Sequence, residues 1–144
     1  MSFETGAVNL LDTIGNTPLV ALENLFSGYR AKVFAKLEFF NPTSSIKDRI
    51  VSHIVADAER TGQLPPGGTI VENTSGNTGA AIAMIAALNG YRAVLTMPDK
   101  VSKEKQAALT ALGAEIVVCP TNAVPGSADH YVQRARDIAD ETPN

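Results

Sequence analysis

The chain has 144 residues, of which 44% are hydrophobic and 19% charged, and this composition excludes wholesale disorder. Its 12 Lys and Arg residues and 15 Asp and Glu residues give a net charge of −3, so no basic excess marks a nucleic-acid or membrane-surface binder. A chain of this length favours one domain, which buries roughly two thirds of the surface of its unfolded state. These values describe an ordinary acidic globular domain.

The single cysteine, Cys119, excludes an internal disulfide and a cysteine-rich zinc site, and we expect its side chain to be buried. His53 and His130 have no metal-ligand spacing, so no metal site is predicted. Residues 1–6 have neither the basic stretch nor the apolar run of a secretory signal. The most apolar run, residues 80–88, is much shorter than the roughly 20 residues that span a bilayer. We therefore expect a cytoplasmic protein that has no membrane partner.

Strand-like runs alternate with helix-like segments in chain order. Residues 32–38 alternate like a strand, and residues 45–61 follow as a helix with Gly62 at the position of a left-handed cap. The apolar residues that recur every fourth position in this helix are Ile46, Ile50, Ile54 and Ala58. Residues 69–72 are predicted as a strand, and the loop 73–78 opens a helix of small residues that ends at Asn89-Gly90.

The remaining predicted elements are the strand 91–97, the helix 103–112 with Ser102 as its N-cap, the strand 114–119, and a final amphipathic helix capped by Ser127. One face of the final helix holds Tyr131, Ala135, Ile138 and Ala139. Three successive strand–helix pairs predict right-handed crossovers, and therefore a three-layer α/β fold with a parallel sheet and flanking helices. Such sheets bind ligands at the carboxyl ends of their strands, where two loops of unusual composition fall.

The first loop is Asn41-Pro42-Thr43-Ser44-Ser45-Ile46-Lys47-Asp48-Arg49. Lys47 lies in the first turn of a predicted helix, beside unpaired N–H groups and the positive end of the helix dipole. That environment disfavours the charged amine and makes the neutral amine, which imine formation needs, easier to reach. The alternative is a solvated helix-end lysine paired with Asp48.

The second loop is Glu72-Asn73-Thr74-Ser75-Gly76-Asn77-Thr78-Gly79. Such a turn at the start of a helix presents backbone N–H groups and hydroxyls to one anion, either a carboxylate or a phosphate. Its spacing is neither the dinucleotide Gly-x-Gly-x-x-Gly pattern nor a P-loop. The alternative is a well-capped turn that binds nothing.

Together with Ile14-Gly15-Asn16-Thr17-Pro18-Leu19, the two loops resemble the cysteine synthase and cystathionine β-synthase family. These are pyridoxal-phosphate enzymes of fold type II, with a tryptophan synthase β-like architecture. Downstream segments are also similar to that family, so the resemblance covers nearly the whole chain. These segments are Met97-Pro98-Asp99-Lys100, Ser102-x-Glu104-Lys105 and Leu112-Gly113-Ala114-Glu115.

The resemblance implies that Lys47 is the catalytic lysine, which binds pyridoxal 5′-phosphate covalently and also moves the substrate α-proton. It implies that Asn77 bonds the phenolic oxygen of the cofactor ring. The substrate α-carboxylate would be bound by Thr74, Ser75, Gly76 and Thr78. The implied reaction is β-replacement on serine or O-acetylserine with a thiol or sulfide, which forms cysteine or cystathionine. The alternatives are a serine/threonine dehydratase-like lyase and a non-catalytic truncated partner that regulates a full-length homologue.

Family catalytic cores are considerably longer than this chain. The resemblance therefore implies that residues 1–40 belong to the larger, cofactor-binding domain, that residues 41–144 form the smaller α/β domain, and that the C-terminal half of the core is absent. Because that half holds the cofactor phosphate, we expect the 144-residue chain alone to be catalytically incompetent. We also expect exposed apolar faces on its N-terminal strands, and either a homodimer or pairing with the missing half. Asn73 departs from the Pro or Ala usual at its position.

Overall fold

The computed structural model describes residues 9–143, so the predictions for residues 1–8 and 144 lie outside the described part. Its elements are, in chain order, η1 (Leu10–Thr13), β1 (Leu19–Ala21), β2 (Phe34–Lys36), η2 (Glu38–Phe40), α1 (Lys47–Thr61), β3 (Thr69–Asn73), α2 (Asn77–Asn89), β4 (Arg92–Pro98), α3 (Lys103–Ala111), β5 (Glu115–Cys119) and α4 (Tyr131–Glu141). The strands β1 and β2 form an antiparallel pair, and β3, β4 and β5 form a parallel sheet in that order.

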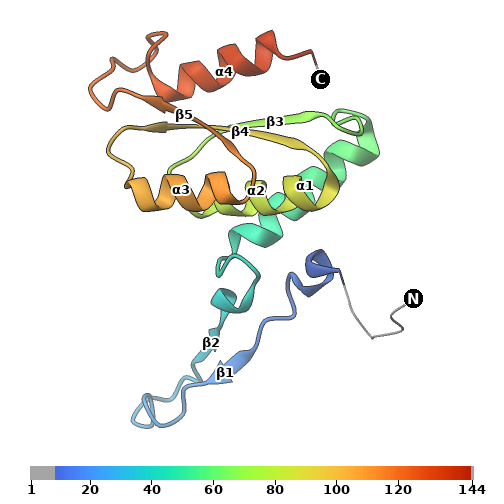
Figure 1. Cartoon of the computed structure of the whole chain (residues 1–144). Helices are drawn as coiled ribbons and strands as arrows, with labels where there is room; N and C mark the ends of the chain where they lie inside the picture. The colour runs from blue at the N-terminus through green and yellow to red at the C-terminus, as the bar shows by residue number, and fades with distance from the viewer. Residues whose placement is uncertain (1–8, 144) are drawn as a thin grey trace.

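The parallel sheet is the middle of three layers, which confirms the predicted fold class. Helices α1, α2 and α3 cover one face, and α4 covers the other (Figure 1). Helices α2 and α3 share a face because two successive right-handed crossovers between neighbouring parallel strands place their helices on the same side. In the register, Val71 lies beside Val94 and Thr96 beside Val117.

The core lies between β4 and α2. The middle strand β4 is covered on both faces, so residues 93–98 are all buried, as expected of a central parallel strand. Helix α2 is buried along residues 81–86 because its small side chains let it lie close against the sheet and α1. This packing fixes the N-terminus of α2 at the carboxyl edge of the sheet.

Helix α1 begins at Lys47, and Gly62 follows its last turn at φ 76°, which confirms the predicted left-handed cap. Its buried residues are Asp48, Val51 and Val55. The isoleucines at the predicted four-residue period face outward instead, with exposed fractions of 49%, 43% and 60% for Ile46, Ile50 and Ile54. Of the four residues at that period only Ala58 packs against the core, so the period predicted the helix correctly but does not mark most of its packed side.

Several boundaries differ from the prediction. The strand expected over 32–38 is reduced to Phe34–Lys36, because the chain turns into η2 at Glu38. The loop expected over 73–78 is shorter at both ends, since Asn73 still pairs in β3 and α2 already begins at Asn77. Ser102 caps α3 as predicted, and its Oγ accepts from Lys105 N at 3.4 Å.

The predicted cap of the last helix is wrong. Helix α4 begins at Tyr131, and His130 occupies its N-cap position without a side-chain hydrogen bond. Ser127 lies in the preceding turn, where its carbonyl accepts from His130 N at 3.0 Å. A turn between the serine and the helix thus replaces the expected first helical turn.

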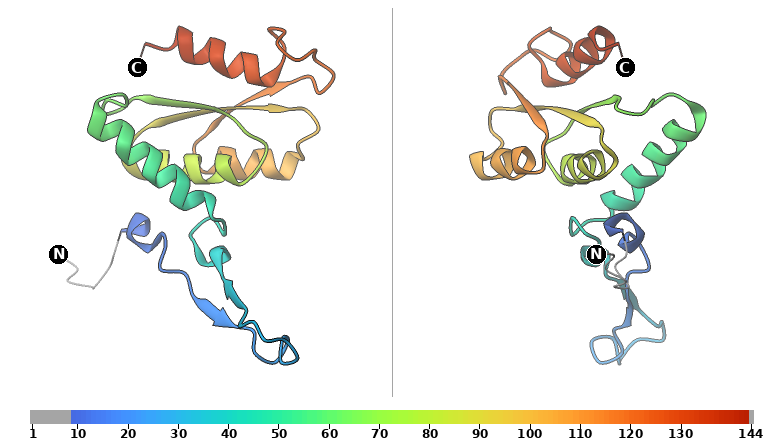
Figure 2. Two further views of the ribbon diagram at one scale, coloured as in Figure 1. Left: turned by 180° about the vertical axis from the view of Figure 1, so that it is seen from behind. Right: turned by 45° about the vertical axis from the view of Figure 1, so that its right-hand side comes forward.

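The β1–β2 hairpin projects away from the parallel sheet, on the side of the α1 layer (Figure 2). Leu19 is 63% exposed and Phe34 is 52% exposed, in line with the apolar faces expected near the N-terminus. Phe39 and Phe40, which follow β2, are also exposed, and their rings lie 4.8 Å apart.

Candidate functional site

Lys47 is the first residue of α1 and is partly buried, at the end of the turn that the sequence singled out. Its backbone N–H donates to Ser45 Oγ at 3.1 Å. Asp48 is fully buried and accepts from Thr43 N at 2.7 Å and from the Thr43 hydroxyl. Within the described residues Lys47 and Asp48 form no ion pair, so Asp48 holds the turn and leaves the amine of Lys47 to other partners.

A polar cluster, which we call the clamp, joins the start of α1 to the N-terminal segment. It consists of Thr17, Glu38, Asn41 and Arg49. Arg49 Nε and Nη2 donate to the two carboxylate oxygens of Glu38 at 2.8 and 3.1 Å, and Arg49 Nη2 also donates to Thr17 Oγ1 at 3.1 Å. Thr17 Oγ1 in turn donates to Glu38 Oε1 at 2.7 Å. The hydrogen bonds from Arg49 and then Thr17 lower the pKa of Glu38 to about 2.

Asn41 connects the clamp to the backbone of the lysine turn. Its Nδ2 donates to Glu38 Oε2 at 2.8 Å and to the Ser45 carbonyl at 3.0 Å, and its Oδ1 accepts from Gly15 N at 2.9 Å. Thr17, Asn41 and Arg49 stand in recognisable sequence motifs, whereas Glu38, the residue that all three bond, does not. Glu38 is a single acidic residue between apolar neighbours, directly before Phe39 and Phe40. This position was the one feature of the sequence that could have indicated a paired carboxylate.

The second loop forms the start of α2. Thr74 is buried, and its Oγ1 accepts from Gly76 N at 3.3 Å and from Gly79 N at 3.2 Å, so its hydroxyl satisfies N–H groups at and just after the N-cap Gly76. A Cβ on Gly79 would lie 2.8 Å from Thr74 Cγ2, whereas one on Gly76 would meet nothing within 4 Å. The loop is therefore closely packed on its Thr74 side and open on its Gly76 side.

Ser75, Gly76 and Asn77 are exposed on the open side. The backbone N–H groups of Asn77 and Thr78 belong to the first turn of α2, where a helix supplies no acceptor for them. A donor-rich turn beside open space fits a carboxylate. Thr78 is partly buried beside this side of the loop.

The residues Ser75–Asn77 line a hollow of about 160 Å³ together with residues of α2 and α3. Lys47 does not line this hollow, but it begins the neighbouring helix α1, which packs against α2. Both predicted loops therefore lie at the N-termini of two adjacent helices. Among residues 9–143, no group of three His, Cys, Asp or Glu side chains is arranged to hold a metal ion.

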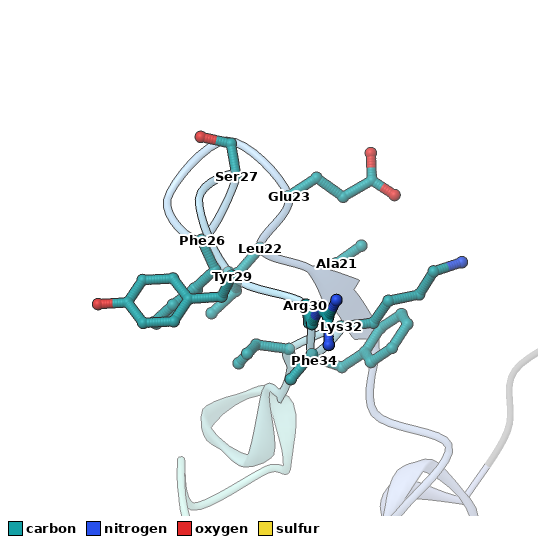
Figure 3. A pocket seen from close by; sticks show the side chains of 11 residues that line it. Ala21, Leu22, Glu23, Phe26, Ser27, Tyr29, Arg30, Lys32 and Phe34 are labelled. Atoms are coloured by element: carbon teal, nitrogen blue, oxygen red, sulfur yellow. The ribbon is translucent and has the colours of Figure 1, made fainter.

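A larger hollow, of about 280 Å³, lies at the tip of the β1–β2 hairpin. Figure 3 shows that its side chains, including Tyr29 and Arg30, all come from one loop and the strand ends beside it. None of the predicted site residues lines it. It is therefore a feature of the hairpin and does not join either of the two loops.

The structure thus contains a parallel α/β sheet, a lysine in the first turn of α1 and a donor-rich loop at the start of α2, which are the features that the resemblance implied. The sequence matches the family described as pyridoxal-phosphate dependent enzyme over residues 10–144. The chain belongs to that family, and the cofactor expectation is confirmed at this level. Within residues 9–143, no helix combines the length and the apolar character needed to cross a membrane.

Named relatives agree with the resemblance seen in the sequence. The chain is 47% identical over 137 residues to the probable cysteine synthase of Bacillus subtilis, with 94% of this chain and 43% of that protein covered. It is 45% identical to the cystathionine β-synthase of Saccharomyces cerevisiae and 48% identical to that of Mus musculus, covering 27% and 25% of those proteins. The crystal structure of O-ureido-L-serine synthase is similar with a TM-score of 0.78 and 41% identity, over 92% of this chain and 40% of that one. The chain thus spans less than half the length of these relatives.

Proposed function

We propose that this chain is part of an enzyme that catalyses pyridoxal-phosphate-dependent β-replacement on serine or O-acetylserine and forms cysteine or cystathionine. The observation that carries the proposal is the position of Lys47, at the start of a helix that packs against α2 and free of an ion pair with Asp48. The relatives named cysteine synthase and cystathionine β-synthase support the reaction class.

In this proposal Lys47 Nζ holds the cofactor covalently and moves the proton at the substrate α-carbon. Asn77, at the exposed start of α2, bonds the phenolic oxygen of the cofactor. The substrate carboxylate is bound by the donors of Thr74, Ser75, Gly76 and Thr78. When bound, pyridoxal phosphate supplies an electron sink for bond cleavage at the substrate α- and β-carbons.

The clamp supports the assigned role of Lys47 because it ties the first turn of α1 to residues that are distant in the sequence. Arg49, two residues after Lys47, is bonded to Glu38 and Thr17 on the N-terminal segment. A covalent catalyst needs a lysine whose backbone is held while its amine moves. We assign residues 1–40 to a larger cofactor domain and 41–144 to a smaller α/β domain, with the clamp between them.

The proposed partners are a small amino-acid substrate and a thiol or sulfide. A homodimer is the proposed assembly, or else pairing with the remainder of the catalytic core, and the proposed location is the cytoplasm. The exposed apolar side chains of the hairpin support an assembly in which another surface covers them.

The test is covalent labelling. The purified chain is incubated with pyridoxal phosphate, its visible spectrum is recorded, and the imine is reduced with borohydride before peptide mapping. Of the six lysines in the chain, we expect Lys47 to carry most of the label, and the Lys47→Arg variant to lose the absorbance band. Lys103→Arg is the matched control, since Lys103 also begins a helix but is exposed on α3.

Label spread evenly over the exposed lysines, both in the 144-residue chain and in the longer protein, would contradict the role of Lys47. Product analysis of the longer protein then separates the reaction classes. Cysteine or a thioether is expected, and pyruvate as the main product would favour a dehydratase-like lyase instead.

A further inference from the structure

Residues 14–19 form a motif to which the proposed reaction assigns no role, and the backbone of this segment is unusual. Gly15 has a φ of 92° and Asn16 has a φ of 46°, so two consecutive residues are left-handed. Glycine adopts this conformation freely, and asparagine adopts it more readily than most other residues. Thr17, directly after the turn, is only 5% exposed and belongs to the clamp. The turn therefore brings the N-terminal segment onto the clamp.

Gly15 lies against the guanidinium of Arg49. A Cβ on Gly15 would lie 3.0 Å from Arg49 Nη1 and 3.6 Å from Arg49 Cζ. An arginine side chain can normally swing away from such a contact, but this one is held by its hydrogen bonds to Glu38 and Thr17. A side chain at position 15 would therefore displace the guanidinium and strain or break these bonds. The glycine leaves the space that the guanidinium occupies.

Arg49 and Lys47 lie on different sides of the first turn of α1. Successive residues of an α-helix are rotated by about 100°, so side chains two positions apart point in nearly opposite directions. The guanidinium need not reach the Lys47 amine to affect it. Because it is fixed on one side, it sets the rotation of this turn about the helix axis, and hence the direction in which Lys47 leaves the helix. The helix residues that are buried in the core, Val51 and Val55, come later in α1.

We propose that Gly15 and Arg49 are positioning residues for Lys47. The turn at Gly15 admits the Arg49 guanidinium, and the guanidinium orients the first turn of α1. The inference rests on the proposed role of Lys47 and adds the residues on which its direction depends. Since Gly15 acts through Arg49, a methyl group at position 15 disturbs Lys47 only while the arginine side chain is present.

The experiment is a double-mutant cycle of Gly15→Ala and Arg49→Ala in the 144-residue chain. The lysines are labelled with pyridoxal phosphate and borohydride, and peptide mapping gives the ratio of the label on Lys47 to the label on Lys103. Each single variant should lower this ratio about tenfold, because misplacing a reacting group by about 1 Å can cost about 100-fold in rate. The double variant should be no lower than Arg49→Ala alone.

A second readout needs no cofactor. The backbone N–H groups of Lys47, Asp48 and Arg49 donate to acceptors on Ser45 and Ile46, at 3.1 to 3.4 Å. Amide hydrogen exchange of these three residues should be faster in both single variants, relative to residues 51–58 of the same helix. Unchanged exchange would contradict the orienting role of the guanidinium.

Two control variants act on the other end of α1. Gly62→Ala introduces a side chain at a φ of 76° with nothing within 4 Å of its Cβ, so it strains the backbone without touching an arginine. Arg60→Ala removes the ion pair with Asp57. Both should leave the labelling ratio unchanged. Arg49→Lys keeps the charge but lacks the forked donors, so it should also lower the ratio and replaces Arg49→Ala if that variant does not fold.

An unchanged ratio in Gly15→Ala, equal effects of Gly15→Ala and Gly62→Ala, or additive effects in the double variant would each overturn the inference. A wild-type chain that selects Lys47, with variants that select it equally well, keeps the proposed function and loses the positioning role. If neither this chain nor the longer protein selects Lys47, the proposed function fails. Hydrogen exchange then decides by itself whether Gly15 and Arg49 orient the turn.

Discussion

Gly79 is the position where the close packing of the α2 loop can be tested most directly. Alanine at this position would place its Cβ 2.8 Å from Thr74 Cγ2 and 3.4 Å from Leu95 Cδ1. Carbon atoms in good contact lie about 3.5–4.0 Å apart, so Thr74 must move. The Thr74 hydroxyl also accepts at the start of α2, and its movement would weaken the hydrogen bonds from Gly76 N and Gly79 N.

The expected cost follows from these opposing effects. Overpacking costs about 1–3 kcal/mol, and a weakened cap adds about 1 kcal/mol. The higher helix propensity of alanine returns about 1 kcal/mol. Gly79→Ala should therefore lower the free energy of unfolding by about 2 kcal/mol. Gly76→Ala, at the N-cap with open space around its Cβ position, should cost less than about 1 kcal/mol.

The assay is urea unfolding followed by circular dichroism, with the Thr74→Ser variant as the second arm of a double-mutant cycle. Serine keeps the capping hydroxyl and removes the methyl group that clashes, so it should restore about 1 kcal/mol in the Gly79→Ala background. Strict additivity of Gly79→Ala and Thr74→Ser, or equal effects of Gly79→Ala and Gly76→Ala, would refute the packing argument.

Three further outcomes are expected. In the folded chain the pKa of Glu38 is about 2, below its ordinary value of 4.5. The clamp therefore stabilises the fold fully above about pH 4.5 and loses that contribution as the pH falls toward 2. Glu38→Gln should make the free energy of unfolding depend less on pH over this interval. Ser44 has a φ of 59°, so Ser44→Gly should leave stability unchanged or raise it by up to about 1 kcal/mol, whereas Ser44→Val should lower it by about 1–2 kcal/mol in urea unfolding. Burial raises the pKa of the Cys119 thiol, so Ellman's reagent should react with it far more slowly in the native chain than in urea.

Sequence periodicity was sufficient to predict the parallel sheet. Four of the five residues from Ala93 to Met97 are apolar because β4 is covered on both faces, and Gly62 ends α1 because no residue with a Cβ adopts its φ as readily. Such signals are local. They depend on residues within one turn or one strand of each other.

What periodicity does not determine is which neighbour an apolar face meets. Helix α1 has apolar residues on two sides: Val51, Val55 and Ala58 pack against the core, while Ile50 and Ile54 remain exposed. The clamp is a second example, because Arg49 and Thr17 are 32 positions apart in the sequence. No local pattern links two polar residues at that separation, so only the folded chain shows that they meet.

The lysine turn is held both locally and at long range, and its strained backbone reflects this. Ser44, the residue with the left-handed backbone, donates its N–H to the Asn41 carbonyl at 2.7 Å. The Asp48 carboxylate, which follows it in the chain, accepts from Thr43 N, which precedes it. Asn41 is itself bonded to Glu38 and to Gly15, which brings the N-terminal segment to the same turn. A left-handed serine persists only where its surroundings over-determine the conformation, and such positions cluster at functional sites. These bonds converge on residues 41–48, the turn that carries Lys47, so the surroundings fix the backbone from which the lysine side chain extends.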